Sequence, residues 1–477
     1  MNRYYHRPAG IALLASLLSL VSCKAPPEKA RPTSSPAPLG WLEPQTSAAS
    51  SALNSRWWSI FANPELAALE EQALNASPSL AKAVARVDEA RAIAGIAEAD
   101  RSLSVNFDPS VTRARASATD KLPPGFPIDT TRLRAALDAS YEIDAWGRVK
   151  KSILAARADA ASASADAATV RLTLTGDVAR NYFQLQASEA ELELLRRILG
   201  SREDSLAIEQ SRVGAGLSND LSVARAQLEI ATTRASLESI ERQTANLRHA
   251  LAVLCGRTPE NGITVAVVPF PILPTVPVGL PSDVLQRRPD VAAAGFALDA
   301  AYSRLGIARA AFFPQLSLTG TMGLESADLS HFIDWPSRIW SLGPSLTLPI
   351  LNGGKNRANY DVASARLAQS IADYRGTILN VFREVEDALS DLQWLARQSA
   401  SLEEALTSAR NVAALSRERY SHGLTNYLDT VDADRSALEI ERTRVQLQGQ
   451  RFVSTIALAK AIGGGWTPSA PEVVAQN

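Results

Sequence analysis

Cysteine, histidine and single-sign charge are what this chain of 477 residues has little of. Its two cysteines exclude a disulfide framework, and its four histidines lack the spacing of metal ligands, so no metal site is expected. Neither charge sign is in excess, because 49 basic residues face 50 acidic ones. Such a chain has no positive field with which to neutralise phosphates, which excludes electrostatic binding of nucleic acid.

Long hydrophobic runs are also missing beyond the N-terminus, although a membrane-spanning helix needs ~20 apolar residues in a row. A multi-pass helical membrane protein is therefore excluded. The chain has instead 46% hydrophobic residues, of which alanine and leucine are the commonest, and only 6% aromatic ones. This composition favours long helices packed closely on more than one side over a single large core.

The N-terminus carries an export signal. Arg3 and Arg7 precede an apolar stretch over 11–21, and small residues lead to Cys23, which predicts a signal peptide over 1–22. Leu20-Val21-Ser22-Cys23 resembles the bacterial lipobox, in which the cysteine becomes the lipidated first residue; the alternative is an ordinary signal with an incidental cysteine. A lipid on Cys23 would anchor the chain to a membrane, and Lys24 favours the outer one. Residues 23–50, rich in Pro, Ser and Ala, are expected to form a tether.

The rest of the chain is a duplication. Gly147 and Gly354 lie 207 positions apart, and at this offset Arg212 matches Arg419 and Gly256 matches Gly463. A constant register over a hundred residues indicates one architecture written twice. The expected divisions are a first repeat over 51–258, a proline-rich crossing over 259–288, a second repeat over 289–463 and a tail over 464–477.

Each repeat predicts a long helical hairpin. No proline occurs over 128–258 or 350–467, and both stretches show helical periodicity. A helix from Gly147 to Arg212 would be ~100 Å long, too long for a globular domain, so the helices are expected to pack side by side as a wall. A glycine-containing turn ends this helix, and the second repeat has the same turn over 421–426.

Two segments of strict alternation precede each hairpin, at about 102–114, 132–144, 315–325 and 338–350. They predict either four strands of a soluble sheet or four membrane-spanning strands of a barrel, apolar outside and polar inside. No predicted helix remains to cover their apolar face, which favours the barrel. Four strands cannot close one, so several copies must share it: two would give a filled barrel and three a twelve-stranded one with a lumen.

No enzyme site emerges from the sequence. Gly353-Gly354-Lys355-Asn356 lacks the spacing and the hydroxyl residue of a phosphate loop, and Cys255 lies on an apolar helix face, where we expect a small buried side chain. No cofactor is expected other than the covalent lipid on Cys23.

The turn of the second hairpin has an unusual charge pattern. Asp429 and Asp432 share a helix face, whereas the first repeat has Ser222 and Arg225 at these positions. In an assembly of several copies, each aspartate would form a carboxylate ring that favours cations if it faces the lumen. The alternative is a solvated helix face with local Asp–Arg pairs.

Taken together, these features resemble one family. The chain is similar to the TolC-like outer-membrane factors of tripartite efflux systems, in the lipoprotein branch that serves resistance–nodulation–division pumps. The motifs that carry the resemblance are Trp57-Trp58 with Phe61 and Pro64, Tyr141-Glu142-Ile143-Asp144-Ala145-Trp146-Gly147-Arg148, Leu285-Gln286-Arg287-Arg288-Pro289-Asp290-Val291, Phe313-Pro314-Gln315-Leu316, and Leu348-Pro349-Ile350 ahead of Gly353-Gly354.

The resemblance implies an α+β membrane protein with four transmembrane strands and long helices per copy. It implies a homotrimer whose twelve-stranded β-barrel in the outer-membrane lipid continues into a periplasmic α-helical barrel. Such a duct has no enzymatic activity and releases small molecules that an inner-membrane pump exports through a periplasmic adaptor, the membrane fusion protein. Alternatives are a conduit for type I protein secretion or heavy-metal efflux, and a periplasmic coiled-coil scaffold or adaptor lipoprotein.

The resemblance also assigns residues. The periplasmic gate of this family lies at the second hairpin turn, although Thr425 departs from members with a charged residue there. The matching gate or constriction positions are Tyr420, Leu428, Asp429, Asp432 and Arg435, and the turns expected to face the adaptor contain Gly216, Leu217, Asn219, Gly423, Leu424 and Asn426.

Overall fold

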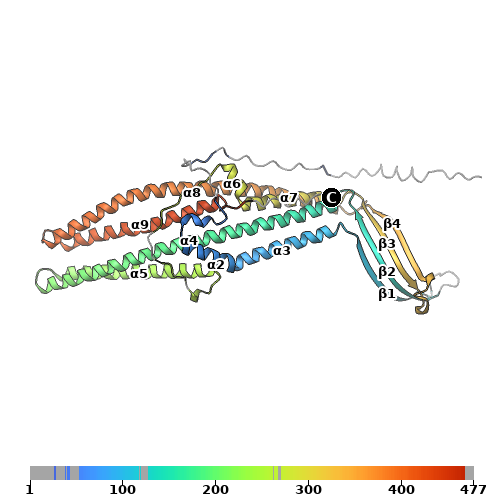
Figure 1. The fold of residues 1–477 in the computed structure, drawn as a ribbon, viewed down its shortest axis with the longest axis horizontal. Helices are drawn as coiled ribbons and strands as arrows, with labels where there is room; N and C mark the ends of the chain where they lie inside the picture. Colours follow the sequence, from blue (N-terminus) through green and yellow to red (C-terminus); the bar gives the residue numbers. More distant parts are fainter. Residues whose placement is uncertain are drawn as a thin grey trace, which may run out of the picture. The chain divides into compact units, whose positions relative to one another are not determined.

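The computed structural model describes residues 26–27, 38, 40–42, 53–117, 119, 127–261, 263–266 and 270–467 (Figure 1). They belong to two compact units, and each unit takes residues from both repeats. The first includes residues 87–162 and 294–374, and the second includes 163–293 and 375–477. The expected signal peptide and Cys23 lie outside the described residues, as does most of the tether.

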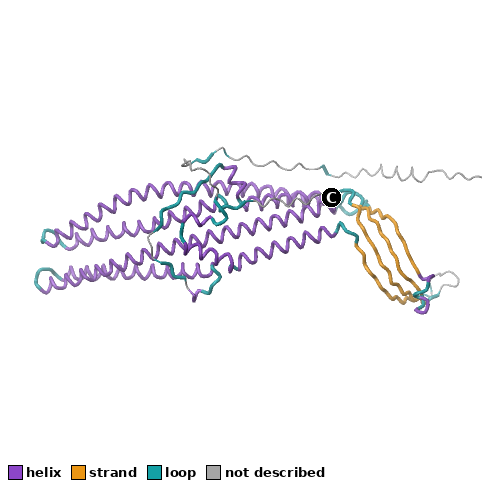
Figure 2. The backbone as a smooth tube through the Cα atoms, in the orientation of Figure 1, coloured by secondary structure: helices purple, strands orange, loops and turns teal. Residues whose placement is uncertain are grey.

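The first unit contains one antiparallel sheet of four strands in the order β1-β2-β3-β4 (Figure 2). The strands lie close to the positions that the alternating segments predicted, and β1 and β4 form the two edges. Each strand has a long helix on one side in the sequence and a loop on the other. The bounds are β1 Ser104–Arg115, β2 Asp129–Ile143, β3 Gln315–Ser326 and β4 Arg338–Thr347.

The sheet separates apolar from polar side chains. Partners across the strands keep to one face, as in Leu137 with Met322 and Met322 with Trp340 on the apolar side. On the other side Arg134 contacts Asp138 at 3.0 Å and Asp108 at 3.6 Å. The apolar face is uncovered in a single copy, because 64% of Phe107 and 81% of Trp340 is exposed. An exposed apolar face of this extent marks a surface that contacts protein or membrane.

A short joint connects β2 to the long helix α4 (Arg148–Gly214) and explains one of the motifs. The Asp144 carboxylate accepts hydrogen bonds from the amides of Val149 and Lys150, which caps the first turn of α4. Arg148 pairs with Glu142 at 2.6 Å. Trp146 stacks on Phe313 at 4.9 Å and donates a hydrogen bond to the Pro314 carbonyl, so the two repeats meet at this joint.

Small residues pack the helices of the first unit. Ala94 and Ala97 on α3 contact Ala156 on α4, while Leu298 and Leu305 on α7 belong to one cluster with side chains of α8. Alanine allows the backbones to approach closely, as the composition predicted. The helices are α3 Pro78–Ala99, α7 Pro289–Ala310 and α8 Lys355–Ser421.

The second unit contains two helical hairpins. The first joins α4 to α5 (Asp220–Leu254), and the second joins α8 to α9 (Tyr427–Ala461). Asn219 and Asn426 cap the returning helices in the same way. The side chain of each accepts a hydrogen bond from the backbone amide three residues later. No described helix combines the length and apolar character needed to cross a membrane.

An aromatic cluster forms the core of the second unit. Trp57 and Phe61, from the N-terminal motif, pack with Phe183 of α4 and Phe452 of α9, and the last two rings stack at 4.5 Å. Cys255 is free and buried in this cluster, as expected. Leu66, Leu69 and Ala73 of α2 (Pro64–Ala76) belong to the same cluster, and the short α6 spans Pro281–Arg287.

The motif around Arg288 ties three helices together. Arg288 is buried and pairs with Asp290 at 2.6 Å and with Glu384 of α8 at 2.8 Å. It also donates a hydrogen bond to the carbonyl of Ala461, the last residue of α9. The guanidinium of Arg288 therefore joins the first turn of α7, the middle of α8 and the last residue of α9 through charge-assisted hydrogen bonds.

Candidate functional site at the hairpin tips

The structure places the predicted gate residues on the second hairpin, at its tip. Tyr420 lies in the last turn of α8, and Leu428, Asp429, Asp432 and Arg435 follow in the first turns of α9. The six turn residues named above lie in the two hairpin loops or cap the returning helix, where Leu217 is 71% and Leu424 67% exposed.

Tyr420 links the two hairpins nearest the tip. Its hydroxyl donates a hydrogen bond of 2.6 Å to the Glu209 carboxylate on α4, which also accepts one from Ser218. Burial and this carboxylate raise the pKa of Tyr420 to about 12, so the phenol remains a neutral donor at any physiological pH. Arg212 lies over the Tyr420 ring, 4.8 Å from its centre. The contact thus combines a charge-assisted hydrogen bond with a cation–π interaction.

Arg435 forms the second link. Its guanidinium pairs with Glu229 of α5, and this pairing raises the pKa of Arg435. Glu229 is buried, but it also pairs at 2.9 Å with Arg202 of its own hairpin. One carboxylate therefore has two cations, one from each hairpin.

A third link lies farther from the tip. Glu191 of α4 is buried and accepts from Arg442 of α9 at 2.9 Å and from Gln446 at 3.1 Å. Both partners come from the second hairpin. Since a buried carboxylate that loses its cation is strongly destabilised, this contact holds the hairpins together more firmly than the Glu229 pair.

The two aspartates of the tip remain exposed in one copy. Asp429 accepts a hydrogen bond from the Thr425 hydroxyl, and its amide is capped by Asn426. Asp432 lies 3.7 Å from Arg435 on the same helix. Leu428, directly before Asp429, is half-buried. A single copy therefore contains the local Asp–Arg pair of the alternative interpretation, and a carboxylate ring needs further copies.

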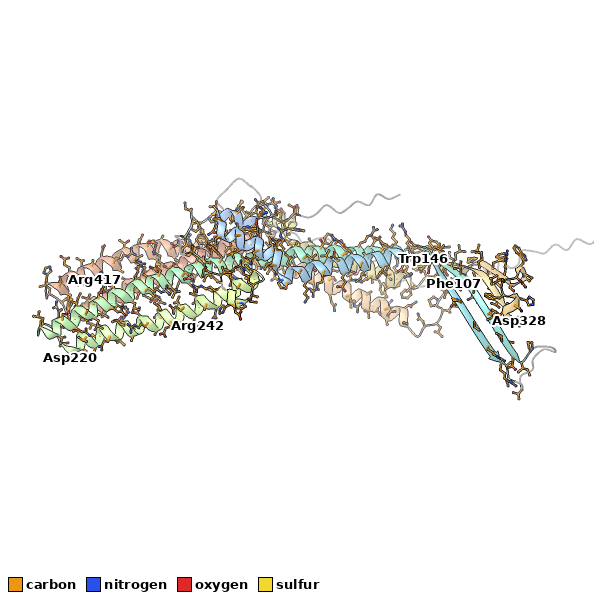
Figure 3. The ribbon with its side chains drawn as sticks, turned by 60° about the horizontal axis from the view of Figure 1, so that its bottom comes forward. Phe107, Trp146, Asp220, Arg242, Asp328 and Arg417 are labelled. Atoms are coloured by element: carbon orange, nitrogen blue, oxygen red, sulfur yellow. The ribbon has the colours of Figure 1, made fainter. Side chains whose placement is uncertain are left out.

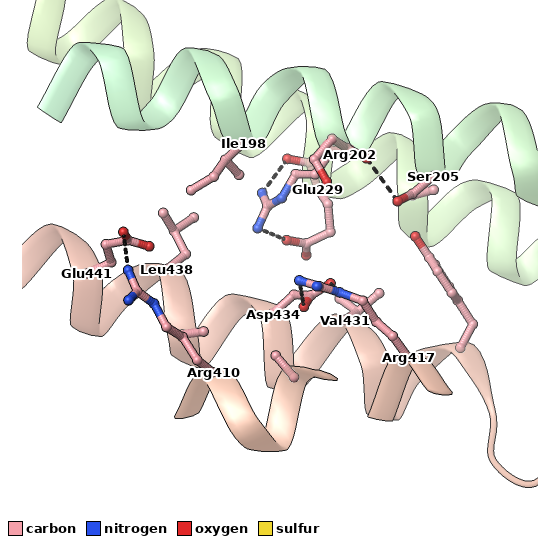
Figure 4. A pocket seen from close by; sticks show the side chains of 15 residues that line it. Ile198, Arg202, Ser205, Glu229, Arg410, Arg417, Val431, Asp434, Leu438 and Glu441 are labelled. Atoms are coloured by element: carbon pink, nitrogen blue, oxygen red, sulfur yellow. Dashed lines mark hydrogen bonds and ion pairs between the residues drawn. The ribbon is translucent and has the colours of Figure 1, made fainter. Parts of the chain in front are cut away.

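A cavity of about 280 Å³ separates the hairpins beside these links (Figure 4). Its walls carry three ion pairs, two of which lie entirely within the second hairpin: Arg417 with Asp434 at 2.6 Å and Arg410 with Glu441 at 2.7 Å. The third is Arg202 with Glu229. Because two of these ion pairs do not cross the space, separation of the hairpins would leave both of them intact.

Glu209, Glu229 and Glu191 were missed by the sequence analysis, yet the repeat contains a signal for them. At the offset of 207, Glu209 and Glu229 match Ser416 and Ser436, and Glu191 matches Gln398. Conversely, Arg435 of the second repeat matches Leu228 of the first. These carboxylates therefore occur only in the first repeat, and their partner Arg435 occurs only in the second. This is expected if the two hairpins diverged in sequence to bind one another.

The comparison with protein families gives a direct answer. The family model described as outer membrane efflux protein matches residues 69–257 and 280–464. The chain belongs to this family. OprJ, an outer membrane protein of Pseudomonas aeruginosa, is 33% identical over 467 residues, which cover 96% of this chain and 97% of OprJ.

Two further matches extend the comparison. CusC of Escherichia coli, named a cation efflux system protein, is 33% identical over 94% of this chain and 97% of CusC. The open state of the MtrE outer membrane channel of Neisseria gonorrhoeae matches with a TM-score of 0.81 and 29% identity, over 92% of this chain and 98% of that chain.

These findings confirm the predicted family, the α+β fold class, the outer-membrane location and the role of an efflux exit duct. They decide against the periplasmic scaffold or adaptor, which was the alternative from another class. The family consists of channel proteins rather than enzymes.

Proposed function

We propose that three copies of this chain form a passive, gated duct without catalytic activity. The observation that carries the proposal is the sheet, which has one apolar face, one polar face and two unpaired edges. Three copies would join β1 to β4 edge by edge into a twelve-stranded barrel with the polar face inside. The helices, which join the strands at the ends opposite to the loops, would continue as a periplasmic tunnel.

The duct would be anchored by a lipid on Cys23. Three residues later, the Pro26 carbonyl accepts a hydrogen bond of 2.8 Å from Arg309 of α7, and the Pro27 carbonyl accepts one from Tyr360 of α8. Arg309 and Tyr360 belong to the same unit as the sheet. This placement supports insertion of the acyl chains into the membrane that the strands span.

The partners of the duct would be a periplasmic adaptor and an inner-membrane resistance–nodulation–division pump. The exposed turns Gly216–Asn219 and Gly423–Asn426 would contact the adaptor. Exposed Leu217 and Leu424 give each turn an apolar side chain that can be buried on docking. Because opening requires a partner that binds the open state better, adaptor contact would supply the free energy.

The gate would open by separation of the hairpins. Tyr420–Glu209 and Arg435–Glu229 would act as latches, because Glu209 keeps Ser218 and Glu229 keeps Arg202 after separation. Glu191 has no partner on its own hairpin among the described residues, since Arg442 and Gln446 both belong to the second hairpin. It would therefore act as the pivot. The aspartates at 429 and 432 would line the constriction of the closed trimer.

Small organic molecules are the proposed cargo. Export of metal cations is a second candidate, supported by the similarity to CusC, which is named a cation efflux protein. Two assays on a strain lacking the gene, with and without the wild-type chain, would separate these candidates. Restored tolerance to dyes and antibiotics alone supports the first, and restored tolerance to copper or silver alone supports the second.

Planar-bilayer recording tests the duct itself. The purified chain should run as a heat-modifiable trimer and give discrete conductance steps. Tyr420→Phe, which keeps the ring but loses the hydrogen bond to Glu209, should raise the open probability. A purified chain that stays monomeric and gives no conductance in lipid would refute the proposal.

A further inference from the structure

The loop end of the sheet carries an arrangement of arginines that the channel function does not use. Arg113 and Arg115 end β1, and Arg338 begins β4. The strand register places all three on the apolar face. Arg113 and Arg115 lie two and four residues after Val111, so they share its face. Arg338 lies opposite Leu324 on the apolar face of β3. Guanidinium groups on a lipid-facing surface call for an explanation.

Their height in the membrane follows from the strand length. On β2 the apolar face runs from Leu133 to Ile143, which is ~34 Å along the strand or ~25 Å across the bilayer at the usual tilt. This equals the hydrocarbon band of an outer-membrane barrel. Arg113 and Arg115 pair with Thr131 and Asp129, beyond the end of this band, so they lie at the level of the lipid headgroups. Arg338 lies opposite Leu324, which pairs with Ala135 just inside the band, and its long side chain reaches from there to the headgroups.

The arginines occur at one end of the sheet only. At the helix end, the same face finishes with Ile143, Leu316 and Leu346, and no strand carries a basic residue on it there. Figure 3 marks the two ends by Trp146, beside the helices, and Asp328, in the connection between β3 and β4. If the helices are periplasmic, as in the proposed function on which this inference rests, the arginines lie in the outer leaflet.

The side chains are prepared to bind an anion. Asp129 is the one acidic strand residue on this face and is matched by Arg115 at 3.4 Å, which leaves two positive charges in excess per copy. Arg113 makes no ion pair with any described residue. Arg338 stacks on the exposed ring of Trp335 at 3.4 Å, which occupies the flat face of the guanidinium and leaves its N–H edge open.

Assembly would bring these groups together. Arg113 and Arg115 lie on one edge strand and Arg338 on the other, so joining β1 of one copy to β4 of the next puts them at one rim. We propose that this rim is a binding site for the phosphate group of an outer-leaflet lipid. The three guanidiniums would bind the phosphate oxygens, and Trp335 would pack against the start of the acyl chains.

Native mass spectrometry of the trimer in uncharged detergent tests the site. The probes are dilauroyl phosphatidic acid, dilauroyl phosphatidylcholine and dilauroyl glycerol at equal concentrations. We expect phosphatidic acid, whose phosphomonoester has a net negative charge, to bind about tenfold better than phosphatidylcholine, whose choline cation offsets the phosphate, and than the glyceride, which has no phosphate. The variant R113Q/R115Q/R338Q should lose this preference.

A matched control lies at the same height on the opposite face. Arg132 pairs with Glu325 at 3.5 Å and lies on the polar face, so Arg132→Gln should leave the lipid preference unchanged. If R132Q abolishes the preference as fully as the triple variant, or if wild type binds the three probes equally, the proposal is wrong. Inorganic phosphate is the third arm: displacement of the lipid at equal concentration would make this a site for free anions and would also overturn it.

A single variant and a conductance recording distinguish loss of the lipid site from loss of the trimer. If the triple variant no longer forms a heat-modifiable trimer, Arg113→Gln alone, at an exposed side chain without an ion pair to a described residue, should still weaken phosphatidic acid binding about threefold. Conductance recorded on the same wild-type sample separates this proposal from the previous one. A conducting trimer without lipid preference refutes the lipid site and leaves the duct intact.

Discussion

Among single residues, Glu70 is the one least expected in its surroundings. It lies on α2 and is fully buried, and neither carboxylate oxygen has a hydrogen-bond partner among the described residues. Burial raises its pKa from an ordinary value of 4.5 to about 9. Glu70 is therefore protonated in the folded protein at neutral pH, although it would be ionised in the unfolded chain.

This shift predicts a pH dependence of stability. Between pH 4.5 and about 9 the folded state holds a proton that the unfolded state has lost, so the free energy of unfolding falls as the pH rises. At pH 7 the loss is about 3 kcal/mol. Glu70→Gln should flatten the slope, and Glu70→Leu should also raise the thermal midpoint. Helical circular dichroism from pH 5 to pH 9 measures both.

Glu71 provides the control for this prediction. It follows Glu70 on the same helix but is exposed, with an ion pair to Arg56 at 3.2 Å. Glu71→Gln should leave the slope of the wild type unchanged. Parallel slopes for wild type and E70Q would show that Glu70 has an ordinary pKa in the assembled protein.

Among the helical elements, the links between the hairpins differ in whether the buried carboxylate keeps a cation when the hairpins separate. Arg435→Gln removes a latch whose carboxylate keeps Arg202, so the closed state should weaken by about 1–2 kcal/mol. The open probability in bilayers should rise about tenfold while the thermal midpoint stays nearly constant.

Arg442→Gln is the matching change at the pivot. It leaves the buried Glu191 with only the Gln446 amide, so the main effect should be a lower thermal midpoint rather than more openings. Identical behaviour of R435Q and R442Q in both assays would contradict the division into latch and pivot.

The sequence predicted the elements far better than the links between them. Strand positions and helix lengths follow from local periodicity, and the repeat shows them twice, so β2 and α4 could be expected within a few residues. Glu229 and Arg435 are 206 positions apart, and no local pattern pairs them. Only the comparison of the repeats, residue by residue, contains that information.

The buried carboxyl of Glu70 shows the other limit. Its spacing from Leu66 and Ala73 places it on the apolar side of α2, but general preference puts a glutamate on the surface. The joint at Trp146 was anticipated only as a family motif. Its physical reason, the stacking on Phe313 of the other repeat, required the fold.

For the whole molecule, the aspartates of the tip act only in an assembly. With three copies, Asp429 and Asp432 would each form a ring of carboxylates, and D429N/D432N should lower cation selectivity and block by multivalent cations. Asn keeps the side-chain shape. Asp220→Asn, which removes the acidic residue in the first turn of α5 on the other hairpin, is the control and should change neither property.

The two free edges of the sheet have a consequence for inheritance. Each copy seals a wall only with its neighbours, so an altered copy disables every assembly that it enters. In a cell that makes normal and edge-defective chains in equal amounts, random mixing into trimers leaves about one eighth of the ducts wholly normal. Such an allele would therefore behave as dominant, and susceptibility to exported compounds would rise although half of the protein is sound.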